Sequence, residues 1–541
     1  MTTTTRTGGI EGGGVDFSGH VPAKKPPRNK YALACSLLAS LASILLGYDI
    51  GVMSGAVIYI KEDLKITDVQ VEILAGILHV FSLIGSAAAG RTSDWIGRCY
   101  TIVVASVIFF AGAILMGFAA NYTFLMAGRF VAGVGVGYAL MIAPVYTAEV
   151  SPASSRGKLT SFPEVFINVG ILLGYVSNVV FSKLPLHLTW RLMLGVGAIP
   201  SIFLGFSVLT MPESPRWLVM QGRLGEAQSV LNRTSDTLEE AQLRLADIKE
   251  AAGIPEHVRD DVIPATKCPK GAGGEGVWRE LFISPTPAVR HILLIGVCFH
   301  FFQQATGIET VVLYSPRIFE KAGIESDHNK LLCTVAVGSI KTLFILIATF
   351  TLDRFGRRKL LLTSIGGMAA SMVFLAIGLT VVDHTDHKVT WALVLSITMV
   401  LSYVSFFSMG MGPITWVYSS EIFPLRLRAT GCSVGVAVNR TMSAGTSMTF
   451  ISLYKAVTIG GAFFLYSSVA VVSFVFFYTL MPETRGRTLE EMESLFGSFF
   501  RWRSTLKELD NYEAATTAKK AANLPQQVQM SSSNDEQRQS G

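Results

Sequence analysis

The chain has 541 residues, of which 50% are hydrophobic and only 16% are charged, with a net charge of +6. A soluble protein of this length would carry more charge, and the mean hydropathy of +0.46 indicates a membrane protein instead. Six cysteines lie singly, without disulfide or metal-ligand spacing, and the sequence contains no nucleophile motif and no phosphate-binding loop. The composition therefore argues against an enzyme, and we expect no metal site and no cofactor.

Beyond a polar, basic N-terminal segment without the features of a cleaved signal peptide, twelve apolar stretches follow along the chain. About 20 apolar residues span a bilayer, and at that length only a helix satisfies its own backbone in lipid. We therefore predict an all-α membrane protein with twelve transmembrane helices. These begin near Tyr31, Glu72, Tyr100, Phe124, Leu159, Trp190, His291, Lys330, Lys359, Trp391, Ala429 and Gly460.

A long polar segment divides the predicted helices into two sets of six. Its stretch 224–252 is rich in Ala, Leu, Glu, Lys and Arg at helical spacing, which predicts short amphipathic helices. Lysine and arginine gather in the N-terminal tail, this segment and every second loop, so the positive-inside bias places both termini in the cytoplasm. The predicted parts are an N-terminal tail (1–30), an N-terminal half (31–210), a helical linker (211–290), a C-terminal half (291–481) and a C-terminal tail (482–541).

Three motifs of the first half return in the second half in the same order. Segment 90–98 is echoed by 353–359, segment 144–149 by 416–421, and segment 212–216 by 482–485. All of them lie at predicted cytoplasmic helix ends. The repetition predicts two duplicated six-helix halves, with a site between them near the middle of the membrane.

The acids and bases in these motifs predict a conformational latch. Carboxylates and guanidinium groups can join one half to the other by charge-assisted bonds in an outward-open state, and release them in an inward-open state. The alternative is that the bases only fix the topology. The latch candidates are Asp94, Arg98, Glu149, Arg156, Glu213, Arg216, Asp353, Arg357, Arg358, Glu421, Arg426, Arg428 and Glu483.

Six ionisable residues interrupt the apolar stretches. A charge in hydrocarbon costs several kcal/mol, so such residues face a bundle interior or a wet cavity, where they pair, bind or carry protons. This makes a membrane transport protein the first hypothesis. The six are Asp49, Arg129, Glu164, Glu309, Lys341 and Arg440.

Several motifs occur together between Tyr31 and Glu491. They are Gly47-Tyr-Asp-Ile-Gly-Val, Gly128-Arg-Phe, Pro212-Glu-Ser-Pro-Arg-Trp, Gln303-Gln-Ala-Thr-Gly-Ile, Asp353-Arg-Phe-Gly-Arg-Arg and Gly412-Pro-Ile-Thr-Trp. As a set they resemble the sugar porter family of the major facilitator superfamily. Ser161-Phe-Pro-Glu, Val311-Val-Leu-Tyr-Ser-Pro-Arg and Val436-Ala-Val-Asn-Arg make the chain most similar to plant polyol/monosaccharide proton symporters. The resemblance implies the major facilitator fold and proton-coupled symport of linear polyols and monosaccharides, by alternating access across a plasma membrane.

A sugar or polyol presents hydroxyl groups, each of which both donates and accepts hydrogen bonds, so its site needs amides, carboxylates and aromatic faces. Gln303 and Gln304 in the seventh helix and Asn439 in the eleventh supply amides where the family places its sugar contacts. Apolar faces for the C–H side of the substrate are expected from Tyr314, Phe407 and Trp416.

Four charged positions depart from the pattern of hexose porters. Those proteins usually have Gln at position 164, Asn at 309 and 341, and Trp at 440, where this chain has Glu164, Glu309, Lys341 and Arg440. A charged hydrogen bond is worth about 1.5–3 kcal/mol against about 1 for a neutral one, so these charges suit a flexible acyclic substrate. The alternative is that Glu309, Lys341 and Arg440 only neutralise one another as a structural network. The two roles are compatible, and we expect these three residues of the C-terminal half to form a contiguous ionic network that borders the cavity.

Asp49 and Arg129 form the expected proton-coupling pair. A half-buried carboxylate near a guanidinium can couple its protonation to substrate binding and conformation, and because arginine keeps its proton, Asp49 is the carrier and Arg129 the modulator. A purely structural bridge is the alternative, and Glu164 is the rival proton site.

Two other functions remain open at this stage: an uncoupled sugar facilitator, and a sugar sensor built on a transporter fold. The expected partners are a small polyol or monosaccharide, protons and the lipid bilayer, with no nucleic acid. We expect the chain to work as a monomer.

Overall fold

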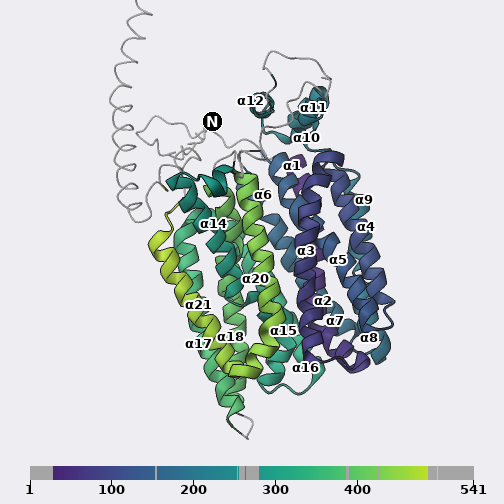
Figure 1. Cartoon of the computed structure of the whole chain (residues 1–541), viewed down its shortest axis with the longest axis vertical. Coiled ribbons are helices and arrows are strands. Elements are labelled where there is room, and N and C mark those ends of the chain that lie inside the picture. Colours follow the sequence, from purple (N-terminus) through teal and green to yellow (C-terminus); the bar gives the residue numbers. More distant parts are fainter. Residues whose placement is uncertain are drawn as a thin grey trace, which may run out of the picture.

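The computed structural model describes residues 29–152, 155–252, 254, 262, 279–385, 389–423, 427–484 and 496. The predicted N-terminal tail therefore lies almost wholly outside the described residues, as does most of the predicted C-terminal tail. The described residues form helices joined by short turns, in two bundles and a small group of linker helices (Figure 1).

The N-terminal half contains six spans, two of which are broken helices. Its elements are α1 (Lys30–Ser40) continued by α2 (Ala42–Leu64), α3 (Asp68–Ile96), α4 (Arg98–Gly117), α5 (Tyr122–Val150), the short α6 (Arg156–Leu159), α7 (Phe162–Phe181), and α8 (Leu186–Gly195) continued by α9 (Ala198–Val208). The linker then forms α10 (Pro215–Met220), α11 (Leu224–Thr234), α12 (Leu238–Ala251) and the π-helix η2 (Arg279–Ile283).

The C-terminal half repeats this pattern with six further spans. They are α14 (Pro287–Ala305) continued by α15 (Ile308–Lys321), α16 (Asp327–Phe355), α17 (Arg357–Asp383), α18 (Thr390–Met409) continued by α19 (Met411–Ile422), α20 (Arg428–Val457) and α21 (Ile459–Leu480). The twelve predicted helices are thus present, with starts within a few residues of the expected ones.

Eleven of these spans are long and apolar enough to cross a membrane, counted over the described residues. The remaining span is α20, a 30-residue helix that carries Asn439, Arg440 and many serines and threonines. It packs between α3 of the first half and α14 of the second, so protein covers its polar groups. The eleven apolar spans and α20 together give the twelve-helix fold.

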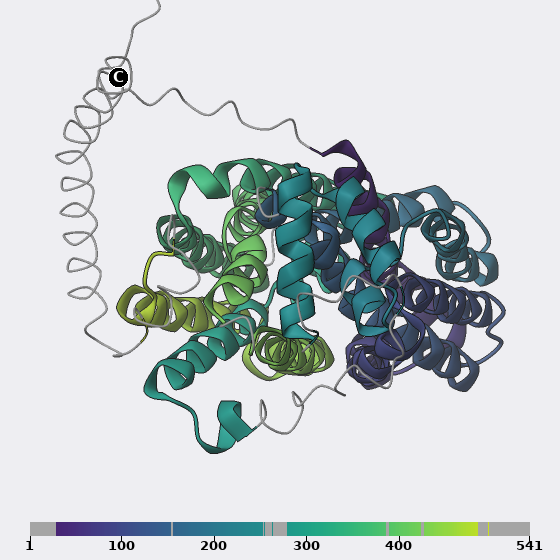
Figure 2. The same ribbon diagram turned by 90° about the horizontal axis from the view of Figure 1, so that it is seen from above.

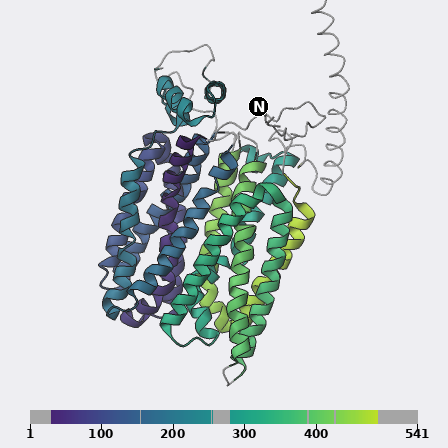
Figure 3. The ribbon, with the colours of Figure 1, turned by 180° about the vertical axis from the view of Figure 1, so that it is seen from behind.

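The two halves stand side by side, and the chain crosses between them through α10–α12 at one end (Figures 1 and 3). We call this the linker end, and the opposite end the far end. Seen from the linker end, the linker helices lie over the bundles (Figure 2). Asn29 donates its side-chain amide to the carbonyls of Arg233 and Ser235, and the Tyr418 hydroxyl donates to the Pro482 carbonyl. The first and last spans therefore both have their outer ends at the linker end.

Close contact between α2 and α7 depends on glycine. A Cβ at Gly47 would lie 1.9 Å from the Ile167 carbonyl oxygen, and a Cβ at Gly170 would lie 2.5 Å from that of Ile44. No larger side chain fits there without separating the two helices. This contact holds the segment of α2 that carries Asp49 in the interior of the first half.

Candidate functional site

An ion pair lies buried at the centre of the first half. Asp49 of α2 accepts from Arg129 of α5 at 2.5 Å, and both side chains are at most 2% exposed. The guanidinium also donates to the carbonyls of Leu74 and Ala75 on α3, at 3.2 and 3.3 Å. The second oxygen of Asp49 accepts no hydrogen bond from any described residue. Three helices thus fix Arg129, while Asp49 keeps one oxygen free to take a proton.

A cluster of amides lies in the second half, as predicted. The Asn439 side chain donates to the Gln303 carbonyl oxygen at 2.7 Å and accepts from Gln304 at 3.3 Å and from Arg440 Nε at 3.2 Å. Gln303 also donates to the Gly412 carbonyl at 3.1 Å. All four polar side chains are 5% exposed or less. Two of their polar atoms, Gln304 Oε1 and Arg440 Nη1, are enclosed and have no hydrogen-bond partner among the described residues, so the hydrogen bonding of the cluster is incomplete in this conformation.

Two helix breaks place this cluster. Gly307 has φ +83°, a conformation that favours glycine, and it separates α14 from α15 directly after the glutamine pair. Gly410 separates α18 from α19, and this break presents the carbonyls of Met411 and Gly412 to Gln303. Broken helices at mid-bundle, lined by polar groups, are typical of transporter binding sites.

Four charges from both halves surround this region. Glu164, Glu309, Lys341 and Arg440 interact electrostatically with one another. None forms an ion pair within 4.0 Å with a described residue. The contiguous network expected for the three C-terminal charges is therefore not made by direct contact. Instead Glu164 of the first half joins them, and two acids balance two bases across the boundary between the halves.

These charges border an accessible space. The carboxylate of Glu309 and the ammonium of Lys341 form no hydrogen bond with described residues and yet are not fully enclosed, so they face a space that water or a ligand can enter. Glu164 is half-buried and lies in the first turn of α7, closer to the linker end than its predicted mid-helix position. Next to it, Asn168 keeps its Oδ1 atom unpartnered. Separated charges with free polar atoms suit a ligand rich in hydroxyls.

The predicted aromatic contacts have different surroundings. Trp416 packs edge-on against His300, with ring centroids 5.0 Å apart, and remains partly accessible inside the bundle. Phe407 is buried beside Gly412. Tyr314 instead donates to the Ser447 carbonyl at 2.8 Å and packs on Phe450, so the structure does not bring it to the amide cluster.

A polar network that we did not predict joins the halves at the far end. Asp68 of α3 binds Arg317 of α15 at 3.0 Å, Lys61 at 2.6 Å and Lys455 of α20. One turn further along α3, Glu72 accepts from the backbone and hydroxyl of Ser452, at 2.7 and 2.6 Å. Between described side chains, the ion pairs that cross from one half to the other all lie here. The far end is therefore closed.

The linker-end motifs are present twice, with the same contacts. In the first half, Arg98 binds Glu149 at 3.1 Å, and Glu213 accepts from the backbone N–H groups of Arg98 and Cys99 at the start of α4. In the second half, Arg357 binds Glu421 at 2.9 Å, and Glu483 accepts from the N–H groups of Arg357 and Arg358 at the start of α17. The predicted duplication therefore extends to individual hydrogen bonds.

These latch candidates make their described contacts within their own half. Asp94 binds Arg98 at 3.3 Å, and Arg358 donates to the carbonyls of Met481 and Tyr478. Arg216 is exposed. A grip of one half on the other stays a prediction for another conformation. Arg426 lies outside the described residues, as do the side chains of Arg156, Asp353 and Arg428.

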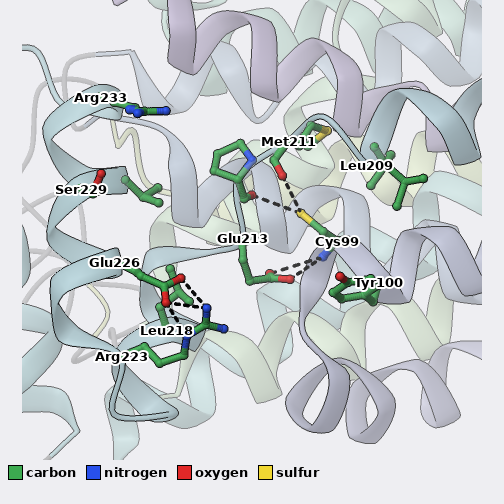
Figure 4. Close-up of a pocket in the computed structure, with 13 residues that line it drawn as sticks. Cys99, Tyr100, Leu209, Met211, Glu213, Leu218, Arg223, Glu226, Ser229 and Arg233 are labelled. Carbon is green, nitrogen blue, oxygen red and sulfur yellow. Dashed lines mark hydrogen bonds and ion pairs between the residues drawn. The ribbon is translucent and has the colours of Figure 1, made fainter. Parts of the chain in front are cut away.

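A cavity of about 390 Å³ lies beside the first of these motifs (Figure 4). Glu213 points across it to the backbone of Cys99, and Arg223 is paired with Glu226 on α11. Burial raises the pKa of the Glu213 carboxyl, while the N–H groups that it accepts from oppose that shift. Because these charged groups already have partners, we assign this cavity to the junction between the start of α4 and the linker helices α10 and α11, and not to a ligand.

The family model described as "Sugar (and other) transporter" matches residues 35–496. The chain belongs to this sugar transporter family. It is thus a multi-pass membrane transporter of sugars or polyols and not an enzyme. "Polyol transporter 5" of Arabidopsis thaliana is 65% identical over 485 residues, which cover 90% of this chain and 89% of that protein. "Putative polyol transporter 1" of the same plant is 62% identical over 490 residues, covering 90% and 96%.

Solved structures of a bacterial family member agree with this fold. The "proton:xylose symporter XylE" bound to 6-bromo-6-deoxy-D-glucose matches with a TM-score of 0.71 and 28% identity, over 87% of this chain and 100% of that one. The inward open conformation of the xylose transporter XylE from E. coli matches with a TM-score of 0.68 and 28% identity, covering 86% and 100%. The major facilitator fold predicted from the sequence is therefore confirmed.

Sequence reasoning missed two groups of residues in this sugar transporter. One is the far-end network around Asp68 and Glu72, whose only signal was a set of charges at predicted outer helix ends. The other is His79 on α3, a lone histidine in an apolar helix, which is 2% exposed and interacts electrostatically with Glu309, Arg440 and Arg129. Neither pattern is specific enough in the sequence to be separated from ordinary structural residues.

Proposed function

We propose that this protein is a proton-coupled symporter that carries linear polyols and monosaccharides across the plasma membrane by alternating access. The observation that carries the proposal is the buried Asp49–Arg129 pair, which leaves one Asp49 oxygen without a hydrogen-bond partner among the described residues. The proton is the coupling ion, no cofactor is needed, and the monomer is the functional unit.

The polyol preference is supported by the charges that border the accessible space. Glu164, Glu309, Lys341 and Arg440 supply donors and acceptors without a fixed mutual geometry, because they do not bind one another directly. An acyclic polyol loses rotamer freedom on binding and needs stronger contacts than a rigid ring does. The named plant relatives, which are polyol transporters, support the same substrate class.

Proton coupling is supported by geometry and by the solved relatives. Arg129 is held by two backbone carbonyls of α3, so its position relative to Asp49 depends on how α3 and α5 pack. A conformational change that alters this packing changes how strongly Asp49 holds a proton. The bacterial neighbour whose title names it a proton:xylose symporter is consistent with this role.

The driving force is adequate for one proton per substrate. One charge moving down 100 mV supplies about 2.3 kcal/mol, and each unit of pH gradient adds about 1.4 kcal/mol. A hundredfold accumulation of a neutral polyol requires about 2.8 kcal/mol. Either component alone is smaller than this, and their sum exceeds it.

The distribution of positive charge supports a cytoplasmic linker end. With that orientation, the far-end network around Asp68 closes the extracellular side, and the structure corresponds to a state closed to the outside. The duplicated linker-end motifs then lie at the cytoplasmic membrane surface, where the latch would act in the opposite state.

The test is uptake of labelled sorbitol into proteoliposomes, with and without an inward proton gradient. The wild type should accumulate sorbitol only with the gradient. Asp49→Asn should lose accumulation but keep exchange of internal for external sorbitol, because its amide imitates the protonated acid and cannot release a proton. Arg191→Lys, at the partly exposed pair with Asp63 near the far end, is the control and should accumulate normally.

Each alternative function has its own outcome in this assay. Wild-type flux that ignores the gradient would indicate an uncoupled facilitator. Binding of sorbitol without flux would indicate a sensor. Full accumulation by Asp49→Asn, together with a substrate-dependent inward current, would remove Asp49 from the proton role.

A further inference from the structure

His79 lies on the inner face of α3 with an incomplete set of hydrogen bonds. Its side chain is 2% exposed and forms no hydrogen bond with any described residue. Its Nδ1 atom is fully enclosed, whereas Nε2 is not. A buried polar group without a partner is costly, so its presence calls for a partner that the protein alone does not supply.

The position of His79 connects the two parts of the site. It follows Ala75 by one helical turn, and the Ala75 carbonyl binds Arg129. It also interacts electrostatically with Glu309 and Arg440 of the second half. The imidazole is therefore within electrostatic range of the arginine of the buried ion pair and of two of the four separated charges.

Helix α3 is also the element of the first half that lies against α20. A Cβ at Gly76 would lie 2.4 Å from the Met448 side chain and 2.8 Å from the Ser447 hydroxyl oxygen, so the two helices are in direct contact one turn before His79. By contrast, a Cβ at Gly445 of α20 would meet nothing within 4 Å. The close contact of α3 with α20 at Gly76 therefore does not continue along α20 as far as Gly445.

We propose that His79 binds a hydroxyl group of the substrate through Nε2 and is the contact that the first half contributes opposite the amide cluster. An enclosed nitrogen is less costly as an empty acceptor than as an unpaired N–H donor, which favours the Nε2–H tautomer and makes Nε2 the donor. The ring interacts electrostatically with two guanidinium groups, of Arg129 and Arg440, and with one carboxylate, of Glu309, so a neutral imidazole avoids a further positive charge beside two arginines. The inference rests on the proposed polyol transport.

Another buried histidine provides a contrast. His300 on α14 lies 3.3 Å from the Ser419 hydroxyl through Nε2, packs on Trp416, and would be touched at 2.3 Å by a Cβ at Gly435. Packing and a hydrogen bond already account for His300. His79 has no hydrogen-bond partner at Nε2 among the described residues, which is why we assign a ligand contact to His79 alone.

The experiment compares the wild type with His79→Leu and His79→Asn, using sorbitol and its monodeoxy analogues. His79→Leu removes the donor, and His79→Asn restores a neutral donor. Ser82→Ala is the control on the same helix, because the Ser82 hydroxyl only returns to the His79 backbone carbonyl. Equilibrium binding to purified transporter and initial uptake rates are both measured.

His79→Leu should weaken sorbitol binding about tenfold, the ratio that corresponds to one hydrogen bond. His79→Asn should recover most of it, with an unchanged pH profile of uptake. One monodeoxy analogue should bind about tenfold more weakly than sorbitol to the wild type and equally well to His79→Leu, because the contact is already lost there.

Three results would overturn the inference. The first is equal sorbitol affinity in the wild type and His79→Leu. The second is that each monodeoxy analogue loses as much affinity in His79→Leu as in the wild type. The third is a loss of sorbitol affinity in Ser82→Ala as large as that in His79→Leu. A pH profile displaced by His79→Asn would replace the neutral contact with a proton-carrying role. Failure of the folded wild type to bind any polyol would overturn the proposed function itself, which is a different outcome.

Discussion

The two halves are alike at the linker end and different in the interior. At the linker end, Arg98 of the first half contacts Glu149 and Glu213. Arg357 of the second half makes the matching contacts with Glu421 and Glu483. In the interior, the first half has a direct ion pair, whereas the second half has hydrogen-bonded amides and charged groups that form no direct ion pair with a described residue.

This difference separates two tasks. Contacts retained in both halves do something that both halves have to do, such as holding the helix ends that move against each other. Contacts that have diverged do something done once, which in the proposed function is carrying a proton in the first half and holding the substrate in the second. His79 and Glu164 are the exceptions, since they belong to the first half and interact with charges of the second.

The largest expected effect is on the direct ion pair. Arg129→Leu should destabilise the protein by about 3–5 kcal/mol, because it leaves Asp49 charged and unpaired in the interior. Asp49→Asn combined with Arg129→Leu should recover most of that loss. Thermal unfolding of the purified variants measures both. If Arg129→Leu alone were as stable as the wild type, water would already supply hydrogen bonds to the Asp49 carboxylate.

The separated charges should respond less. Lys341→Asn leaves one excess negative charge among Glu164, Glu309 and Arg440, and should cost about 1–3 kcal/mol of stability. Lys341→Asn with Glu309→Asn restores the balance and should be more stable than Lys341→Asn alone. If the double variant transports, its preference for polyols over hexoses should fall in a competition assay. A larger loss in the double variant would show that each charge has a separate structural role.

The duplicated capping acids should behave as a matched pair. Glu213→Ala and Glu483→Ala each remove a carboxylate from a helix start and should each cost about 1–2 kcal/mol. If both ends serve the same movement, both variants should also change the transport rate in the same direction and by similar factors. If only one of the two variants changed the transport rate, the two motifs would have different roles in transport, even with equal losses of stability.

The smallest effect is expected at the far end, where the charges are partly exposed. Asp68→Asn weakens three ion pairs, two of which join the halves, and together these should be worth about 1 kcal/mol. The expected result is a modest shift toward the state open at the far end. Labelling of a cysteine placed at Ser452 should become a few times faster, and Glu62→Gln, at an exposed acid of α2 near the same end, is the charge-matched control.

Much of the fold could be predicted because the signals are local in sequence. Hydropathy gave the helices, and the repeated motifs gave the two halves. The Asp49–Arg129 pair was also predictable, since two opposite charges buried in the same half have few other partners. The amides at 303, 304 and 439 were found through the family resemblance, and the structure brings them into contact.

What could not be predicted depends on distances between helices. Sequence reasoning assigned Glu309, Lys341 and Arg440 to one network, but helix packing keeps their charged groups apart and adds Glu164 from the other half. Tyr314 lies on the expected helix, yet its hydroxyl is bound to the Ser447 carbonyl. The direction in which a side chain points at a helix break depends on backbone angles that hydropathy does not encode.

The polar side chains of α20 affect how the protein is inserted into the membrane during synthesis. A helix that carries Arg440 and Asn439 at its centre enters lipid poorly when it leaves the translocon alone, since an arginine there opposes insertion by about 2.5–3.5 kcal/mol. The helices that cover its polar side are α14 and α3, one from each half. Insertion of α20 therefore depends on a segment synthesised more than 300 residues earlier. Despite their duplicated ends, the two halves mature as one unit, and the binding site is completed only when its most polar wall is in place.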